Sequence, residues 1–449
     1  MGVIELGLVT DAGQEPLESL SRPIRHGDLR RILLAAIALL CLFGVTASAL
    51  PVSHAPRQLW TVPFRDGSDG FTVTPEAVYV LSTMDGSLTA YASHTGEVLW
   101  SSTELGGASW VGAVESGVML LPAEDTTVQV DDPEGGGSYY RQFTRRTVAV
   151  DAATGRHLWR QPGDFAASAD GLVLLVEWND DGTSARTLRV VRLRDGSPVW
   201  DRPGGGLETW VAGNGIGAGS DRLVTVTDSG ATTVYDLTNG REVASGRLPW
   251  NRQDRGDGTY TNISAEGHRL YLENVVDQRG TVSAYDTETL GKLWQIDTRS
   301  YGGFTSCGPV LCISTPLGTT GYDRDTGHLR WSRADAANVY PITGGLLVVD
   351  EQNGGRRTLI DAGSGVAVID MGTATLVWDY TSADDMPYLV SHTEEPAGRM
   401  AVSRLDSRTR HVRLLGTIDA ISENSCQSAA TILACVAAGD GRLAVTDVG

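Results

Sequence analysis

The segment VYVLSTMDGSLTAYASHTGEVLW, Val78 to Trp100, contains the structural unit that repeats along this chain. It has two runs in which apolar and polar residues alternate, joined by a polar turn, and then a Thr-Gly turn before a short run that ends in tryptophan. Alternation with a period of two places one face of a β-strand against a core. The segment therefore predicts a β-hairpin followed by a further, outer strand.

Related segments follow at spacings of about 35 to 60 residues, which is the range of a propeller blade. We expect each terminal tryptophan to fill the space between two neighbouring blades. The copies are RRTVAVDAATGRHLW (to Trp159), TLRVVRLRDGSPVW (to Trp200), TTVYDLTNGREVA (near Val243), TVSAYDTETLGKLW (to Trp294) and TTGYDRDTGHLRW (to Trp331), with weaker ones in TLIDAGSGVAVI (near Ile369) and MAVSRLDSRTRHVRLL (near Leu414).

The two ends of the repeat region complete one blade. The C-terminal segment Leu433–Gly449 stops where the short tryptophan strand should follow, and RQLW, Arg57–Trp60, supplies that strand. Closing a ring in this way removes free sheet edges. We predict an all-β protein, a β-propeller over residues 57–449 with head-to-tail closure. We count eight blades of four antiparallel strands, because one stretch between Gly372 and Leu414 is degenerate.

A hydrophobic segment precedes the repeats. Residues Ile32 to Val52 contain no charged side chain, and about 20 apolar residues span a bilayer as a helix. Four arginines lie just before it, which by the positive-inside rule places the preceding residues in the cytoplasm. We therefore expect a single-pass protein of the cell membrane, with a cytoplasmic disordered tail (1–31), a transmembrane helix (32–52) and an extracytoplasmic propeller. The alternative is a signal peptide cleaved near Ala49, so that the protein is secreted.

The composition disfavours several classes of function. The formal charge of −19 repels nucleic acid and anionic lipid headgroups, so we predict no nucleic-acid partner and membrane contact through the N-terminal helix only. The chain has no H-E-x-x-H, G-x-S-x-G or P-loop motif. We predict no catalytic residue, no metal site and no cofactor.

Four cysteines form two close pairs, Cys307/Cys312 and Cys426/Cys435. Both pairs fall at the same place in their repeats, just before and on a core strand. This placement predicts two hairpin disulfides in an oxidising compartment, each contributing about 2 kcal/mol because the loops are short. A redox dithiol would need a spacing closer to C-x-x-C, and a metal site would need nearby histidines.

One repeat carries a long insertion, EDTTVQVDDPEGGGSYYRQ, at residues 124–142. Long loops on a rigid scaffold often carry binding functions, and exposed tyrosines suit a protein interface. We therefore predict a candidate interaction loop; the alternative is a solvated hairpin tip without a partner. Its residues are Asp131, Asp132, Glu134, Tyr139 and Tyr140.

The segments TVAVDAATGRHLW and LTAYASHTGEVLW are similar to the PQQ-like repeat of quinoprotein-type propellers, and the chain resembles the membrane-anchored PQQ-binding-like propellers of actinobacteria. The resemblance implies a propeller fold. The quinoprotein enzymes of that superfamily have a vicinal disulfide, and this sequence has no Cys-Cys pair. Their non-catalytic relative is an outer-membrane assembly scaffold, which binds partner proteins through its loops.

These observations together predict a binding or scaffold module for proteins or cell-envelope components, without catalysis. The alternative is a PQQ-dependent dehydrogenase-like quinoprotein, or a protein that binds PQQ.

Overall fold

The computed structural model describes residues 55–449, except 66, 106, 109, 132–137, 216–217, 252–258, 278, 299–302, 343, 353–354, 379–386 and 407–408. The predicted tail (1–31) and transmembrane helix (32–52) therefore lie outside the described residues. Within the part of the chain that is described, no helix has the length and apolar character needed to cross a membrane.

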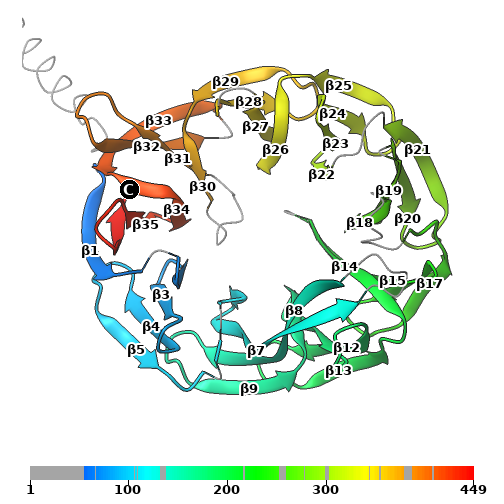
Figure 1. The fold of residues 1–449 in the computed structure, drawn as a ribbon. Helices are drawn as coiled ribbons and strands as arrows, with labels where there is room; N and C mark the ends of the chain where they lie inside the picture. Colours follow the sequence, from blue (N-terminus) through cyan, green and yellow to red (C-terminus); the bar gives the residue numbers. More distant parts are fainter. Residues whose placement is uncertain are drawn as a thin grey trace, which may run out of the picture. The chain divides into compact units, whose positions relative to one another are not determined.

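Nine four-stranded antiparallel sheets are arranged around a common centre (Figure 1). Each sheet is one blade, and in every blade but the last its strands run from the innermost to the outermost in chain order. The first four blades are blade 1 with β2 (Asp69–Val73), β3 (Ala77–Ser82), β4 (Ser87–Ala92) and β5 (Val98–Ser102); blade 2 with β6 (Ala113–Glu115), β7 (Val118–Asp131), β8 (Ser138–Asp151) and β9 (His157–Pro162); blade 3 with β10 (Asp164–Ala169), β11 (Leu172–Trp178), β12 (Ala185–Arg192) and β13 (Pro198–Pro203); and blade 4 with β14 (Leu207–Gly215), β15 (Ala218–Thr227), β16 (Ala231–Asp236) and β17 (Glu242–Arg247).

The remaining blades follow the same order, and the last one joins both ends of the described chain. They are blade 5 with β18 (Tyr260–Glu266), β19 (Arg269–Val276), β20 (Arg279–Asp286) and β21 (Lys292–Thr298); blade 6 with β22 (Gly303–Cys307), β23 (Val310–Thr315), β24 (Gly318–Asp323) and β25 (Leu329–Arg333); blade 7 with β26 (Ala336–Ile342), β27 (Leu346–Glu351), β28 (Arg357–Asp361) and β29 (Ala367–Gly372); blade 8 with β30 (Thr375–Val377), β31 (Tyr388–His392), β32 (Arg399–Asp406) and β33 (His411–Asp419); and blade 9 with β34 (Ile421–Ala429), β35 (Ile432–Ala437), β36 (Arg442–Asp447) and β1 (Arg57–Pro63).

The ring closes through blade 9 as the sequence predicts. Strand β1 pairs antiparallel with β36, from Arg57 opposite Asp447 to Pro63 opposite Arg442. The outer strand of this blade thus comes from the start of the repeat region and the other three strands come from its end. The predicted head-to-tail closure is confirmed.

The prediction of eight blades is wrong, because the structure has nine. The degenerate stretch between Gly372 and Leu414 contributes most of a complete blade, blade 8. Its repeat signature is weak because Arg410, at φ +57°, occupies the place of the turn glycine. In addition, Gly416 pairs with Val402 at the register position that tryptophan holds in other blades.

Contacts between a tryptophan and a glycine join neighbouring blades. In blade 1, the indole N–H of Trp100 on β5 donates a hydrogen bond to the carbonyl of Ala152 in blade 2, at 3.0 Å. Its ring lies against Gly155, where a Cβ would come within 2.6 Å of ring atoms. The same contact recurs as Trp60–Gly96, Trp159–Gly196, Trp200–Gly240, Trp294–Gly327 and Trp331–Gly365, and in each case the indole bonds the carbonyl three residues before the glycine.

Six of the nine junctions between blades have this Trp–Gly contact, and three do not. Between blades 4 and 5, Ala244 stands at the tryptophan position, and Leu290, at φ +55°, stands at the glycine position. A large side chain from the turn thus compensates for a small one on the outer strand. The other two junctions are those on either side of blade 8.

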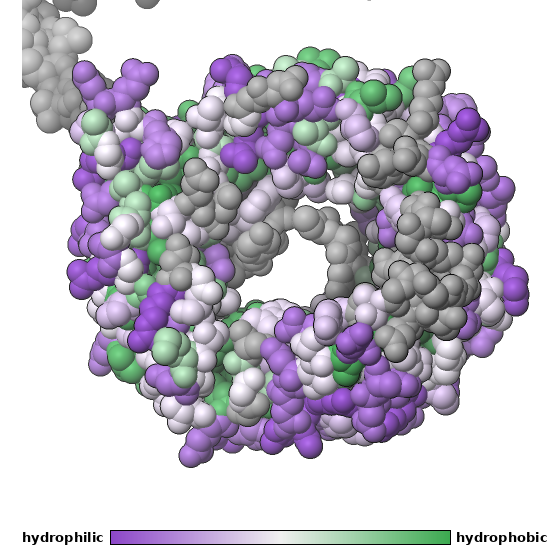
Figure 2. Space-filling model, in the orientation of Figure 1, coloured by the Kyte–Doolittle hydropathy of each residue, from purple (hydrophilic) through white to green (hydrophobic). Residues whose placement is uncertain are grey.

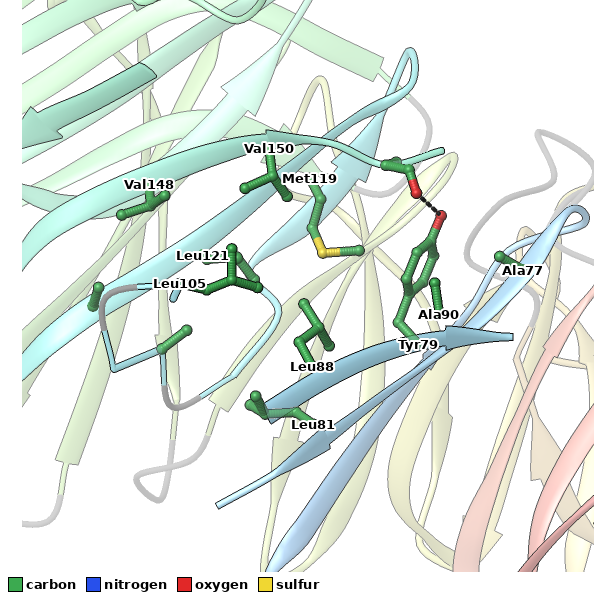
Figure 3. Packing of buried hydrophobic residues seen from close by; sticks show 13 residues of the cluster. Ala77, Tyr79, Leu81, Leu88, Ala90, Leu105, Met119, Leu121, Val148 and Val150 are labelled. Atoms are coloured by element: carbon green, nitrogen blue, oxygen red, sulfur yellow. Dashed lines mark hydrogen bonds between the residues drawn. The ribbon is translucent and has the colours of Figure 1, made fainter. Parts of the chain in front are cut away.

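Apolar side chains of neighbouring blades fill the space behind these contacts. Figure 3 shows the cluster between blades 1 and 2, in which Leu88 and Met119 from facing sheets are both fully buried. At its edge, the hydroxyl of Tyr79 donates a hydrogen bond to the carbonyl of Ala152, the same group that accepts from Trp100. One turn of blade 2 therefore anchors two aromatic side chains of blade 1.

The Trp–Gly contact predicts that Gly155→Ala destabilises the propeller by about 2 to 4 kcal/mol. About 1 kcal/mol arises from the positive φ of this residue, and the remainder from the clash with the ring of Trp100. Gly171→Ala is the matched control, because Gly171 has a similar φ but nothing within 4 Å of its Cβ position. Denaturant unfolding measures both variants, and equal losses would contradict the role of the ring contact.

Candidate interaction surface

The two faces of the ring carry different connections. Because the strands of each blade are antiparallel, the hairpins between second and third strands share one face with the connections from blade to blade. We call this side the hairpin face. The opposite side carries the Asp-x-x-Thr-Gly turns, and the chain enters β1 there, since Arg57 lies opposite Asp447 at the end of β36. Figure 2 shows one side of the ring, with a hollow at its centre.

Several hairpins on the hairpin face expose apolar side chains at or near their tips. Met84 in blade 1 is 73% exposed, Tyr140 in blade 2 is 72% exposed and Leu317 in blade 6 is 70% exposed. Val276 in blade 5 and Trp110, in the connection to blade 2, are also exposed. Apolar tips that recur on one side of a rigid scaffold are typical of an interaction surface.

The insertion predicted from the sequence forms a two-stranded extension of blade 2. Strands β7 and β8 have 14 residues each, whereas the innermost strand β6 has only three. The pairing of β7 with β8 continues to Asp131 opposite Ser138. The insertion is thus a long hairpin that projects beyond its own blade, and Figure 1 shows β7 reaching across towards β12.

Aromatic side chains hold this hairpin against blade 3. Phe143 on β8 is buried and lies 6.0 Å from Trp178 at the end of β11, measured between ring centroids. Trp178 in turn lies 5.5 Å from Trp210 on β14 of blade 4. The rings therefore form a continuous row across three blades, and each such contact contributes about 0.5 to 1.5 kcal/mol beyond its buried area.

Two arginines add polar contacts to the same interface. The guanidinium of Arg141 lies 4.8 Å from the ring centroid of Trp178 and donates to the carbonyl of Gly182 at 2.8 Å. Arg145 forms an ion pair with Asp180 at 3.0 Å. Gly182 packs against the hairpin as well, because a Cβ there would lie 2.5 Å from Val128. The base of the hairpin is consequently held in one orientation.

A half-buried carboxyl group, that of Asp164, lies beside this hairpin. The hydroxyl of Thr144 on β8 donates a hydrogen bond to Asp164 at the start of β10. Burial raises the pKa of Asp164, although the hydrogen bond from Thr144 acts in the opposite direction. Of the residues that the structure describes, no group of three or more histidine, cysteine or acidic side chains could hold a metal ion.

The candidate interaction loop is described only in part. Tyr140 lies opposite Gln129, Tyr139 opposite Val130, and Asp131 opposite Ser138. Asp132 and Glu134 lie outside the described residues. Phe143, Trp178 and Trp210, which brace the hairpin, were not predicted from the sequence. The available signal was that Trp178 and Trp210 are tryptophans that do not end a repeat unit.

Both predicted disulfides are present, Cys307–Cys312 and Cys426–Cys435. Each joins the first and second strands of its own blade, in blades 6 and 9 respectively. The prediction of two hairpin disulfides is therefore confirmed.

A second hollow lies between blades 7, 8 and 9, with a volume of about 610 Å³. Trp378, His392 and the Cys426 half of a disulfide contribute to its lining. The one arginine among its lining residues, Arg357, is bound to Asp350 at 2.7 Å and to the carbonyl of Ala374. The guanidinium of Arg357 is thus already paired with neighbouring groups of the protein. For this reason we place the main candidate interaction surface at the β7–β8 hairpin.

This arrangement defines a β-propeller of PQQ-like repeats. The family described as outer membrane protein assembly factor BamB (PQQ_2) matches residues 133–275 and 278–416, more than half of the chain. The chain therefore belongs to this family. No curated protein matches the chain significantly.

Several solved structures are similar to this chain at low sequence identity. BamB from Moraxella catarrhalis is 13% identical, with a TM-score of 0.40, over 69% of this chain and 95% of that chain. The computationally designed Ika8 protein is 12% identical, with a TM-score of 0.45, over 87% and 99%. The quinohemoprotein alcohol dehydrogenase ADHIIG from Pseudomonas putida HK5 is 11% identical, with a TM-score of 0.39, over 89% and 78%.

Two aspartates are expected to affect stability with opposite signs as the pH changes. The pKa of Asp164 is raised by burial, so the folded state binds its proton more tightly, and its contribution to stability falls as the pH rises through its titration. The pKa of Asp151 is lowered, chiefly by the hydroxyl of Thr154, so its contribution is present at neutral pH and is lost on acidification.

We therefore expect Asp164→Asn to stabilise the protein at neutral pH and Asp151→Asn to destabilise it, with both effects fading towards acid. Urea unfolding from about pH 3 to about pH 7 measures the difference from the unsubstituted chain. A loss of stability at neutral pH in Asp164→Asn would show that the charged form of this carboxylate stabilises the fold, contrary to this account.

Proposed function

We propose that this chain is a non-catalytic binding or scaffold propeller that holds a protein partner on its hairpin face, outside the cytoplasmic membrane. The observation that carries the proposal is the β7–β8 hairpin, which is braced over blade 3 and keeps the side chain of Tyr140 exposed. Rigid presentation of an aromatic side chain lowers the entropic cost of binding.

Two further features support a protein as the partner. Met84 and Leu317 add apolar side chains at other hairpins of the same face, so a partner with an extended surface could contact several blades. The family to which the chain belongs carries the description of an assembly factor, which fits a protein that binds other proteins.

The hairpin face is tested with a photoreactive benzoylphenylalanine introduced at Tyr140 in the full-length chain in its native cells. We expect crosslinked protein adducts to be several-fold more abundant than with the same group at Leu329. Leu329 is the control because it is an exposed apolar residue on the outer strand of blade 6. Comparable labelling at both positions, or none at Tyr140, would argue against a partner on this face.

The absence of catalysis is tested separately. The purified chain is mixed with PQQ and calcium, and reduction of an artificial electron acceptor is followed with alcohol and aldehyde substrates. We expect no reduction above the background without protein. Reduction of the acceptor above background would overturn the proposal that the chain is non-catalytic. It would not affect the proposal that the chain binds a protein, which the crosslinking experiment tests.

Attachment to the membrane is proposed to depend on residues 32–52. We expect the full-length chain to remain with membranes through alkaline carbonate extraction, and a chain that begins at Arg57 with an exported leader to be released, because about 20 apolar residues anchor a helix in a bilayer. Fractionation with immunoblotting measures both. A mature protein whose N-terminus lies just after Ala49 would instead establish cleavage and secretion.

A further inference from the structure

The outer strand of blade 8, β33, differs from the other outer strands in length. It has nine residues, whereas the outer strands of the other blades have five to seven. It is the last strand of its sheet, paired only with β32. Its outer edge therefore presents backbone N–H and C=O groups along an unusually long stretch.

The first half of β33 is also uncovered on both sides. His411, Val412, Arg413 and Leu414 are all exposed. Leu414 is 62% exposed and Val412 is 39% exposed, and these two apolar side chains point to the same side of the strand. Further along the strand, Gly416 holds the tryptophan position and lies against Pro56.

The charge of this segment is opposite to that of the chain. Residues 404–413 contain four arginines and one histidine but a single acid, Asp406, while the whole chain carries −19. Arg410 is engaged in an ion pair with Asp361 at 3.5 Å. Arg413 is exposed and forms no ion pair with any described residue. On a protein that is otherwise acidic, a basic stretch attracts acidic partners to that one place. The attraction is therefore specific for this part of the surface.

We propose that β33 is a docking edge for an acidic, extended peptide segment of a partner protein, which adds to blade 8 as an antiparallel strand. Addition of a strand satisfies the free backbone groups of the edge, and side chains then select the partner. Acidic side chains of the added strand lie opposite Arg413, and apolar ones lie opposite Val412 and Leu414. This site is separate from the β7–β8 hairpin, so either proposal can fail alone.

The probe is a short fluorescent peptide in which glutamate alternates with valine, titrated into the full-length chain and followed by anisotropy. We expect saturable binding that weakens with added salt. A peptide with lysine in place of glutamate tests the charge, and a peptide with N-methylated backbone amides tests the strand pairing. Both should bind far more weakly; binding of the N-methylated peptide at equal affinity would overturn the strand addition.

The position of the site is tested with two matched variants. Arg413→Glu should weaken binding of the acidic peptide roughly fivefold to tenfold, since it replaces an attraction with a repulsion. Arg247→Glu is the control, because Arg247 is an exposed arginine on the outer strand of blade 4, which also lacks the tryptophan. Both variants alter exposed side chains, and equal unfolding midpoints confirm that each is folded. Equal binding by both variants would overturn the assignment to β33, as would absence of binding to the unsubstituted chain.

Discussion

The ring depends on a hydrogen bond between a tryptophan indole on one blade and a backbone carbonyl in a turn of the next. The Trp159 indole donates to Leu193 at 2.7 Å, and its ring lies against Gly196. The contact combines burial of a large aromatic surface with satisfaction of its one polar group. It also requires a glycine, since a side chain would occupy the space of the ring. Each such junction fixes the position of one blade relative to the next.

At the three junctions that lack the Trp–Gly contact, the structure departs from the regular repeat. Between blades 4 and 5, Leu290 fills the space with its own side chain. On either side of blade 8 the described residues form no Trp–Gly contact, and the first half of the outer strand β33 is exposed. Blade 2 departs in another way, because its long hairpin rests on blade 3 through Phe143 and Trp178. Both candidate binding sites lie at departures from the repeat, because the regular contacts are occupied by the fold itself.

The extent of the prediction can be judged from particular residues. The repeat pattern correctly predicted that Trp100 lies on an outer strand and Gly155 in a turn. It also predicted that Arg57–Trp60 pairs with the C-terminal strands. It miscounted the blades, because Arg410 and Gly416 replace the two residues that make a unit recognisable. It singled out Tyr140 at the exposed part of the hairpin, but not Trp210, which lies about 70 residues away along the chain and belongs to the aromatic row that braces the hairpin. Contacts over such separations leave no local pattern.

The sequence by itself determined the fold class, the ring closure and the two disulfides. Each of these follows from a local pattern, either alternation, turn chemistry or the spacing of cysteines, that recurs at a fixed place in the unit. Only the tertiary structure decided the number of blades, the bracing of the β7–β8 hairpin and the exposure of β33. These depend on which side chains of neighbouring blades meet, and packing between blades compensates for residues that break the local pattern.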